Sequence, residues 1–477
     1  MAENEQSKES VQESLQQVIH LLGKEGLADE LAREPDTRDS LSDMLARKQN
    51  LAELQQKLDE LHPADVAYIL EALPIEQRLL VWDLVKAARD GEILLEVSDA
   101  VRQTLIAEMD SNELLAAAEQ LDTDEIADLA PDLPHDVLQE LMISLDLQNR
   151  QRLESAMAHP EHSVGALMDF DIVTIREDIT LEVVLRYLRR LGRLPDLTDK
   201  LFVVDRENRL RGVLPLKRLV VHDAEVSVEE IMADDAVVFH PEEEASDAAQ
   251  AFSRYDLVTA PVVDADNNLV GRLTVDAVMD FMQEESESEA LSLAGLREDE
   301  DIFASVWKSL QNRWAWLLIN LCTAFVASRV IGVFEGSIEK IVALAALMPI
   351  VAGIGGNSGN QTITMIVRGL ALGQVSTHNM RALLTKELTV ALLNGLVWGG
   401  AIGLVAFALY HNFALGLVMM AAMTLNLLLA AFMGVMIPLV MTRLNRDPAV
   451  GSSVMITAMT DSGGFFIFLG LATVFLL

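Results

Sequence analysis

The sequence predicts a multi-domain membrane protein, in which an all-α helical-repeat N-terminal domain, a tandem α/β domain and a connecting helix precede a five-helix α transmembrane domain. The first observation is a split in charge: residues 1–301 hold 27 Lys and Arg against 68 Asp and Glu, whereas residues 302–477 hold nine against five. The second is the long stretch between Glu387 and Arg443, which has no Asp, Glu, Lys or Arg, and the third is a pair of internal repeats in the acidic half. The acidic half excludes a nucleic-acid-binding protein, because contacts with phosphate need a basic surface.

Residues 1–157 are predicted to form an acidic all-α domain. They are rich in Leu, Ala, Glu and Gln, and their apolar residues recur at helical spacing. The segment LHPADVA, which begins at Leu61, returns as LDTDEIA, which begins at Leu121. Pro63 suits the first turn of a helix, and either Asp122 or Thr123 can cap the helix of the second copy. A repeat of this kind predicts a small helical solenoid.

Residues 158–283 contain a second repeat, with an α/β pattern. LFVVDRENRLRGVLPLKRLV at 201–220 returns as APVVDADNNLVGRLTVDAVM at 260–279. Each copy predicts a short strand, an amphipathic helix, two strands joined by a polar turn, and a final helix. The pattern resembles a tandem pair of CBS domains, which are regulatory modules without catalytic chemistry. The resemblance makes ATP a candidate ligand of the pair, although the extra residues of the first copy near Arg193 alter one ligand cleft.

Residues 284–312 are predicted to form a connecting helix, because the acidic segment EESESEALSLAGLREDED lacks the Gly, Ser and Pro content of a flexible linker. Residues 313–477 form the predicted membrane domain. A transmembrane helix needs about 20 apolar residues, and this part of the chain offers five such stretches. They cover approximately 314–333, 341–367, 385–410, 413–441 and 448–477.

The Lys and Arg residues of the membrane domain predict its orientation. Most of them fall before the first span or in the loops after the second and fourth spans: Lys308, Arg313, Arg368, Arg381, Lys386, Arg443 and Arg446. Loops rich in Lys and Arg mark the cytoplasmic side of a membrane. We therefore expect the acidic half to lie in the cytoplasm, and an odd number of spans to place the C-terminus outside.

The second predicted span carries a polar segment, GGNSGNQ, at residues 355–361. Tight helix packing explains glycines in a span, but it does not explain amide side chains, which need water, an ion or protein partners in a hydrocarbon environment. We therefore predict that this segment lines a pathway. A locally loosened helix here would also offer carbonyl oxygens, which are ligands of hard cations.

The last predicted span carries one carboxylate, Asp461. A helix with Asp447 as its N-cap and Pro448 at its first position places Asp461 about 21 Å along the axis, near the middle of the bilayer. A lone carboxylate there is costly unless it faces water or a cation, and an ion pair with Arg329 is the alternative. Oxygen ligands without His or Cys favour Mg²⁺ or Ca²⁺ over zinc or copper. Two copies of Asp461 at a shared axis would give one hydrated Mg²⁺ two carboxylates.

The complete arrangement resembles the MgtE family of bacterial magnesium channels. The matching motifs are GGNSGNQ in the second span and DPA…TD in the last span, and the resemblance covers nearly the whole chain. It implies a homodimer in the bacterial inner membrane, surrounded by lipid, with Asp461 binding the permeating ion. The other pore residues that it implies are Gly353, Gly356, Asn360 and Thr364, with Glu339 near the outer mouth.

The resemblance also implies an acidic interface that binds regulatory Mg²⁺. Its residues are Asp124 and Asp128 in the helical domain, Glu244, Asp276, Asp280, Glu285 and Glu289 in or near the end of the second CBS copy, and Asp447 before the last span. Ser246 and Ser288 stand where the family commonly has acids, and Asp276 is alone in TVDAV. Acidic modules repel one another unless cations bind between them, so we expect high internal Mg²⁺ to favour a closed state.

The predicted function is therefore a Mg²⁺-selective channel that high cytoplasmic Mg²⁺ closes. A secondary carrier of divalent cations such as Co²⁺, Mn²⁺ or Ni²⁺ is the alternative, because five spans and one carboxylate also permit alternating access. An enzyme is not expected, since the sequence has no phosphate-binding loop, no His/Cys metal cluster and no nucleophile motif.

Overall fold

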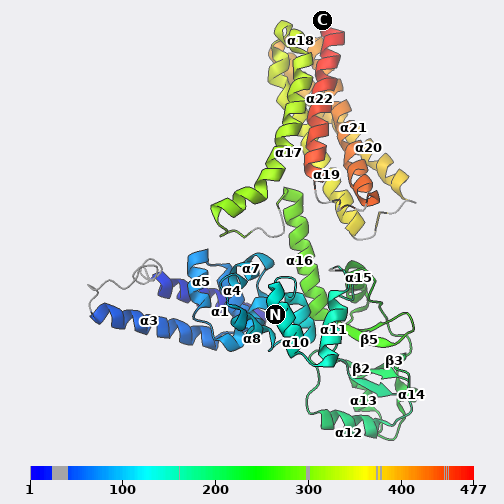
Figure 1. Ribbon diagram of the computed structural model, residues 1–477. Coiled ribbons are helices and arrows are strands. Elements are labelled where there is room, and N and C mark those ends of the chain that lie inside the picture. The colour runs from blue at the N-terminus through cyan, green and yellow to red at the C-terminus, as the bar shows by residue number, and fades with distance from the viewer. Residues whose placement is uncertain are drawn as a thin grey trace. The chain divides into compact units, whose positions relative to one another are not determined.

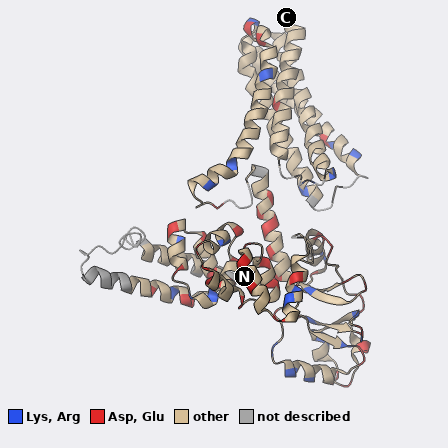
Figure 2. Cartoon of the chain, viewed as in Figure 1, with Lys and Arg blue, Asp and Glu red and all other residues tan. Residues whose placement is uncertain are grey.

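Helices make up most of the chain in the computed structural model, which describes residues 2–23, 41–160, 162–296, 301–371, 374–375, 379–444, 446, 448 and 451–477. The chain divides into two units (Figure 1). The first comprises Met1–Glu284 with Asp301–Phe303, and the second comprises Glu285–Glu300 with Ala304–Leu477. Asp and Glu residues are numerous along the first unit, whereas the long helices of the second unit near the C-terminus contain few charged residues (Figure 2).

The predicted all-α N-terminal domain is confirmed. Its helices are α1 (Ala2–Gly23), α3 (Leu41–Glu60), α4 (Pro63–Glu71), α5 (Ile75–Trp82), the 3-10 helix η1 (Ala87–Arg89), α6 (Asp90–Glu96), α7 (Asp99–Ile106), α8 (Ser111–Ala118), α9 (Thr123–Leu129), α10 (His135–Ser144) and α11 (Leu147–Met157). The sequence repeat recurs in the helices, because α4 and α5 of the first copy correspond to α9 and α10 of the second. Of the two predicted caps for α9, the structure uses Asp122, whose backbone N–H donates to Glu125 at 2.8 Å.

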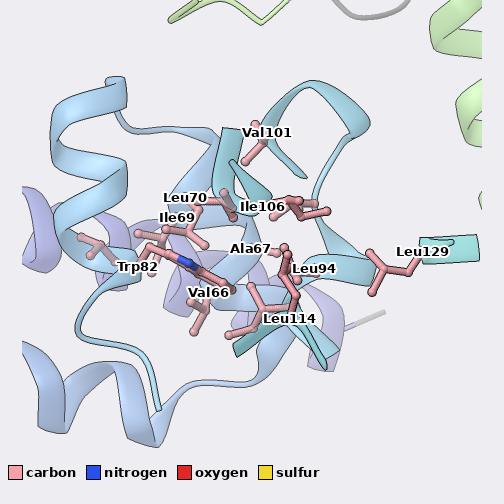
Figure 3. Packing of buried hydrophobic residues seen from close by; sticks show 14 of the residues in the cluster. Val66, Ala67, Ile69, Leu70, Trp82, Leu94, Val101, Ile106, Leu114 and Leu129 are labelled. Atoms are coloured by element: carbon pink, nitrogen blue, oxygen red, sulfur yellow. The ribbon is translucent and has the colours of Figure 1, made fainter. Parts of the chain in front are cut away.

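The core of this domain is apolar and shared by most of its helices (Figure 3). Ile69 and Leu70 of α4 are fully buried, as are Leu94 of α6 and Leu129 of α9. Burial of one such side chain contributes about 1.5–3 kcal/mol. The short helices are therefore stabilised by mutual packing, because isolated helices of this length are marginal in water.

A buried ion pair ties this domain to the chain segment that precedes the first membrane helix. Arg78 of α5 is 0% exposed, and its two terminal nitrogens contact the carboxylate oxygens of Asp301 at 2.7 and 3.3 Å. Its Nε donates to the carbonyl of Leu70 at 2.9 Å. Asp301 also accepts a hydrogen bond from the backbone N–H of Phe303 at 2.8 Å. The two residues are 223 positions apart, and no local pattern in the sequence marks this pairing.

We expect Asp301→Ala to destabilise the helices around Arg78 by about 3–5 kcal/mol, because the guanidinium would stay buried without its counter-charge. Hydrogen exchange of the α4 and α5 amides in the full-length protein measures this directly. Lys86→Ala is the matched control, since Lys86 pairs with Asp59 at the surface, and such a pair contributes about 1 kcal/mol or less. Equal protection of α4 and α5 in wild type and Asp301→Ala would contradict the assignment.

The tandem α/β domain is confirmed, and the two sequence copies share a helix, two antiparallel strands and a following helix. The short first strand predicted for each copy forms only in the first copy; in the second copy it is reduced to an isolated parallel bridge between Phe239 and Val262. The first copy has β1 (Thr174–Arg176), α12 (Leu181–Leu191), β2 (Lys200–Val204), β3 (Leu210–Pro215) and α13 (Leu216–Val221). The second has α14 (Val228–Ile231), α15 (Ala245–Tyr255), β4 (Thr259–Val263), β5 (Leu269–Thr274) and the first turns of α16 (Val275–Ala294). β2 pairs parallel with β1 and antiparallel with β3, and β4 pairs antiparallel with β5.

The two copies meet through their equivalent turns. Asn208 donates from its side chain to the carbonyl of Leu269, and Asn267 donates to the carbonyl of Leu210, both at 3.0 Å. Both asparagines have a φ of 64°, in the left-handed region that Asn tolerates better than most residues. The polar turn that marked the repeat in the sequence is thus also the contact between the copies.

The connecting helix is confirmed as α16, but its extent differs from the prediction of 284–312. It begins inside the second copy at Val275 and ends at Ala294, where Gly295 follows with a φ of 76°. Residues 301–305 are not helical, and residues 297–300 lie outside the described part of the chain. Helices commonly end at a glycine with a positive φ. α16 therefore ends before Gly295, although the residues that follow have a composition typical of helices.

The second unit contains the membrane helices. They are α17 (Val306–Val333), the short α18 (Glu335–Lys340), α19 (Ala343–Ala371), α20 (Met380–Tyr410), α21 (Phe413–Arg443) and α22 (Ser452–Leu476). Among the described helices, α17, α20, α21 and α22 are long and apolar enough to cross a membrane. The fifth predicted span corresponds to α19, whose 29 residues include the polar segment that lowers its hydropathy. Since α19 packs against α21 and α22, we keep it as a predicted span.

The start of the last span differs from the prediction. α22 begins at Ser452 and not at 448, because Gly451 directly before it has a φ of 80°, which is not helical. The predicted N-cap, Asp447, lies outside the described residues. Asp461 is the tenth of 25 helical residues, about 5 Å from the midpoint of the helix. A position near the middle of the bilayer therefore remains the expectation for Asp461.

Candidate functional site

The polar segment of α19 presents two different faces. Gly353, Asn357, Gln361 and Thr364 are exposed, and Asn360 between them is half-exposed. Their spacing of three or four residues puts them on one side of a helix. A Cβ added to Gly353 would meet no atom within 4 Å, so this side of α19 borders open space in the single chain.

The opposite face of the same segment is packed tightly. Gly355 and Gly359 are buried, and a Cβ at either position would collide with Asn426 of α21 or Ile456 of α22. Tight helix packing and the lining of a pathway, the two explanations for glycines in this span, therefore apply to different residues. Gly355 and Gly359 serve close packing, whereas Gly353 belongs to the open polar face.

Asp461 lies on α22, which packs against α19 and α21. Its side chain is half-buried, and among the described residues it has no hydrogen bond or ion pair. Arg329, the alternative partner, stands over the ring of Phe325 at 4.9 Å and does not pair with Asp461. A Cβ added to Gly356 of α19 would lie 3.7 Å from Oγ1 of Thr460, the residue before Asp461. The carboxylate thus lies on a helix that directly adjoins the polar segment.

The helical domain and the CBS pair, both in the first unit, share a group of carboxylates. Asp124 and Asp128 of α9 were expected here, and Asp280 of α16 was expected as their counterpart. The structure adds Asp169 and Glu284, which interact electrostatically with Asp124 and Asp128, respectively. The sequence did not single out these two acids, because nothing local distinguishes them from the many solvated acids of this half.

Burial and like charge raise the pKa values of this group. Burial raises the pKa of Asp124 to about 7, and the neighbouring Asp169 carboxylate adds to the effect. Part of the Asp128 side chain reaches solvent, yet desolvation by its surroundings, opposed by Arg102 and reinforced by Glu284, raises its pKa to about 7. Partial desolvation and the neighbouring Asp276 raise the pKa of Asp280. Carboxylates that resist ionisation in this way favour a bound cation or a proton.

The other predicted sensor residues are placed as follows. Asp276 and Asp280 are exposed near the start of α16, and Glu285 is exposed further along it. Glu244 is exposed directly before α15, and the neighbours that raise the pKa values of Asp124 and Asp128 do not include it. Glu289 is half-buried on α16, and Glu339, the residue expected at the outer mouth, is exposed on α18.

A ready-made metal centre is absent from the described residues: no three His, Cys, Asp or Glu side chains stand close enough together to hold an ion. The carboxylates of the first unit therefore form an acidic interface in this conformation and not a closed coordination shell.

We expect the first unit to loosen as pH rises when divalent cations are absent. An aspartate whose pKa is raised in the folded state binds more protons there, so its stabilising effect is complete at low pH and is lost as pH rises from about 4 through 7. Limited proteolysis of the full-length protein in chelator should therefore quicken across this window. Mg²⁺ at matched ionic strength should slow digestion and flatten the pH dependence, because it replaces the protons. An equally steep dependence in Asp124→Asn/Asp128→Asn would contradict the assignment to these two residues.

Comparisons with known proteins cover nearly the whole chain. Residues 61–162 match the MgtE intracellular N domain, residues 164–225 and 228–284 match the CBS domain, and residues 348–471 match MgtE, described as a divalent cation transporter. The magnesium transporter MgtE of Thermus thermophilus is 31% identical over 432 residues, which cover 89% of this chain and 95% of the relative. MgtE of Bacillus subtilis is 24% identical over 433 residues, covering 91% and 96%. A crystal structure of the cytosolic domain of the Mg²⁺ channel MgtE in complex with ATP aligns with 51% of this chain and 98% of that one, at 32% identity and a TM-score of 0.45.

Proposed function

Because this chain belongs to the MgtE family of magnesium transporters, we propose that it is a Mg²⁺-selective channel that cytoplasmic Mg²⁺ closes. Like its family, it is a multi-pass membrane protein that transports divalent cations, has cytosolic N-terminal domains and is not an enzyme. The observation that carries the channel proposal is the exposed polar face of α19 next to the helix of Asp461. We place the protein in the bacterial inner membrane, with the C-terminus outside.

The pathway runs along that polar face. Asn357 and Gln361 are exposed in the middle of a membrane domain, where contact with lipid would leave their amides without partners. Water or hydrated ions satisfy them at a lower cost. Asp461 supplies the negative charge that attracts the cation, with Gly353, Gly356, Asn360 and Thr364 along the path and Glu339 at its outer mouth. A site of oxygen atoms around a partly hydrated ion suits Mg²⁺.

A second copy of the chain completes the pathway. In the single chain the polar face borders open space, and a homodimer would close it on its other side. Two Asp461 carboxylates would then face one ion, and their mutual repulsion would be relieved by that ion. This arrangement also keeps the polar face away from lipid.

Closure by Mg²⁺ uses the acidic interface of the first unit. Asp124 and Asp128 on one side, with Asp276 and Asp280 on the other, attract cations that bind between the modules. The resemblance to the family also assigns Glu244, Glu285, Glu289 and Asp447 to the binding of regulatory Mg²⁺, and these assignments stay predictions. The buried ion pair of Arg78 and Asp301 connects the helical domain directly to the segment just before α17. Movement of the helical domain is thereby transmitted to the membrane helices along a second route besides α16. Binding of ATP by the CBS pair stays a prediction.

Electrical recording from the purified protein in a planar bilayer tests the proposal against its alternative. A channel gives unitary current steps in Mg²⁺ solutions, whereas a secondary carrier gives slow, saturable flux without such steps. Replacing Mg²⁺ with Co²⁺, Mn²⁺ or Ni²⁺ in the same experiment measures selectivity. Saturable uptake with no unitary steps at low cytoplasmic Mg²⁺ would favour the carrier.

A further inference from the structure

A buried amide on α21 is not explained by the proposed pathway. Asn426 is 0% exposed and lies in the long uncharged stretch between Glu387 and Arg443. Its Nδ2 donates to the carbonyl of Val351 on α19 at 2.9 Å, and its Oδ1 has no partner among the described residues. A half-satisfied amide is costly in an apolar domain, so its presence calls for a physical reason.

Two glycines leave room for this amide. A Cβ added to Gly355 of α19 would overlap Nδ2 of Asn426, and a Cβ added to Gly464 of α22 would stand 2.7 Å from the same atom. Both contacts are too close for any side chain larger than hydrogen. The side chain of Asn426 therefore fills a slot between Gly355 of α19 and Gly464 of α22. Its hydrogen bond to Val351 fixes the amide against α19.

The slot lies at the level of the proposed pathway. Gly355 stands between Gly353 and Gly356 in the sequence, on the opposite side of α19 from the open polar face. Gly464 follows Asp461 by three residues, which is nearly one turn of α22. The contacts of Asn426 are therefore made directly behind the segments that carry the pathway residues of both helices.

We infer that Asn426 is a positioning residue for divalent transport: it sets the spacing between the polar face of α19 and the Asp461 carboxylate of α22. The inference rests on the proposed pathway and deepens it. Asn426 itself is fully buried between the helices, and we do not assign it a contact with the ion. It determines how well the oxygen atoms of α19 and α22 match the size of a hydrated cation. A misplacement of about 1 Å at a functional site can lower its rate as much as a hundredfold.

The test is a double-mutant cycle on Mg²⁺ uptake by the reconstituted full-length protein. Asn426→Ala removes the hydrogen bond, and Gly355→Ala drives a methyl group into the amide. We expect each to raise the half-saturating Mg²⁺ concentration about tenfold, measured per inserted protein. In the double variant the methyl group fits into the space that the amide leaves, so the combined effect should be smaller than the product of the two.

Two controls separate positioning from stability. Gly332→Ala adds a methyl group to α17 where no atom lies within 4 Å, and Asn412→Ala removes the N-cap of α21, where Oδ1 accepts from the N–H of Leu415 at 3.1 Å. Both should leave the half-saturating concentration unchanged, even if Asn412→Ala lowers the yield of folded protein. The inference is overturned if Asn426→Ala lowers only the yield, or if the effects of Gly355→Ala and Asn426→Ala simply multiply. Wild-type uptake by Asp461→Asn would instead reject the pathway, and this inference with it.

Discussion

Asp461→Asn is expected to lower Mg²⁺ uptake by the reconstituted protein by roughly a hundredfold or more, while the variant still folds and inserts. The change preserves the size of the side chain and removes its charge. Asp461 is the acid of α22, and it has no protein counter-charge among the described residues. Loss of one charge interaction with a partly desolvated divalent ion costs on the order of 3 kcal/mol, and each 1.4 kcal/mol corresponds to about a factor of ten. Uptake into vesicles that contain a Mg²⁺-sensitive dye measures the effect.

Glu335→Gln is the matched control for this experiment. Glu335 is an exposed acid of the same membrane domain, at the start of α18, and the pathway does not use it. Its neutralisation should leave uptake within about twofold of wild type, as expected for an exposed charge in high dielectric. Uptake by Asp461→Asn at the level of Glu335→Gln would show that the α22 carboxylate does not bind the transported ion.

Removal of residues 1–157 is expected to give a transporter that still conducts but closes poorly when internal Mg²⁺ rises. The deletion ends with α11 and removes Asp124 and Asp128, and it also removes Arg78 from its pair with Asp301. Mg²⁺ then loses part of its differential affinity for the closed state, and a ligand shifts an equilibrium only by that difference. The membrane helices belong to a separate unit, so they should fold without this domain. Uptake measured against internal Mg²⁺ for both proteins checks the prediction.

Point variants show whether the carboxylates or the whole domain cause the effect. Asp124→Asn/Asp128→Asn in the full-length protein should raise the inhibitory Mg²⁺ concentration, while Asp136→Asn, an exposed acid of α10 in the same domain, should not. If the truncated and full-length proteins are inhibited at the same Mg²⁺ concentration and to the same depth, the domain is a scaffold and takes no part in closure.

Repeats and hydropathy explain why most of the architecture was predictable. In both internal repeats, corresponding helices or strands begin at corresponding positions of the two copies. A repeated pattern of apolar residues specifies the same local fold twice. Four spans follow from hydropathy alone. The error at the start of the last span has a local cause: Pro448 suits a first helical turn, but Gly451 adopts a positive φ that no pattern of apolar residues announces.

The site was predictable only where one residue stood out from its surroundings. Asp461 and the GGNSGNQ segment are conspicuous because the neighbouring sequence is apolar, and Asn426 could have been found by the same signal. Asp169 and Glu284 could not, because each is one of 68 acids in an acidic half. The Arg78–Asp301 pair depends on tertiary packing between distant parts of the chain, which leaves no mark in local composition.

The most direct test of the central claim, that the transported ion also closes its own pathway, is a recording from an excised membrane patch with its cytoplasmic face exposed. Cytoplasmic Mg²⁺ is stepped from micromolar to millimolar while open probability is measured at constant ionic strength. We predict frequent opening at low Mg²⁺ and a steep, reversible fall at high Mg²⁺ in the wild type. An open probability that does not change across this range would contradict the account.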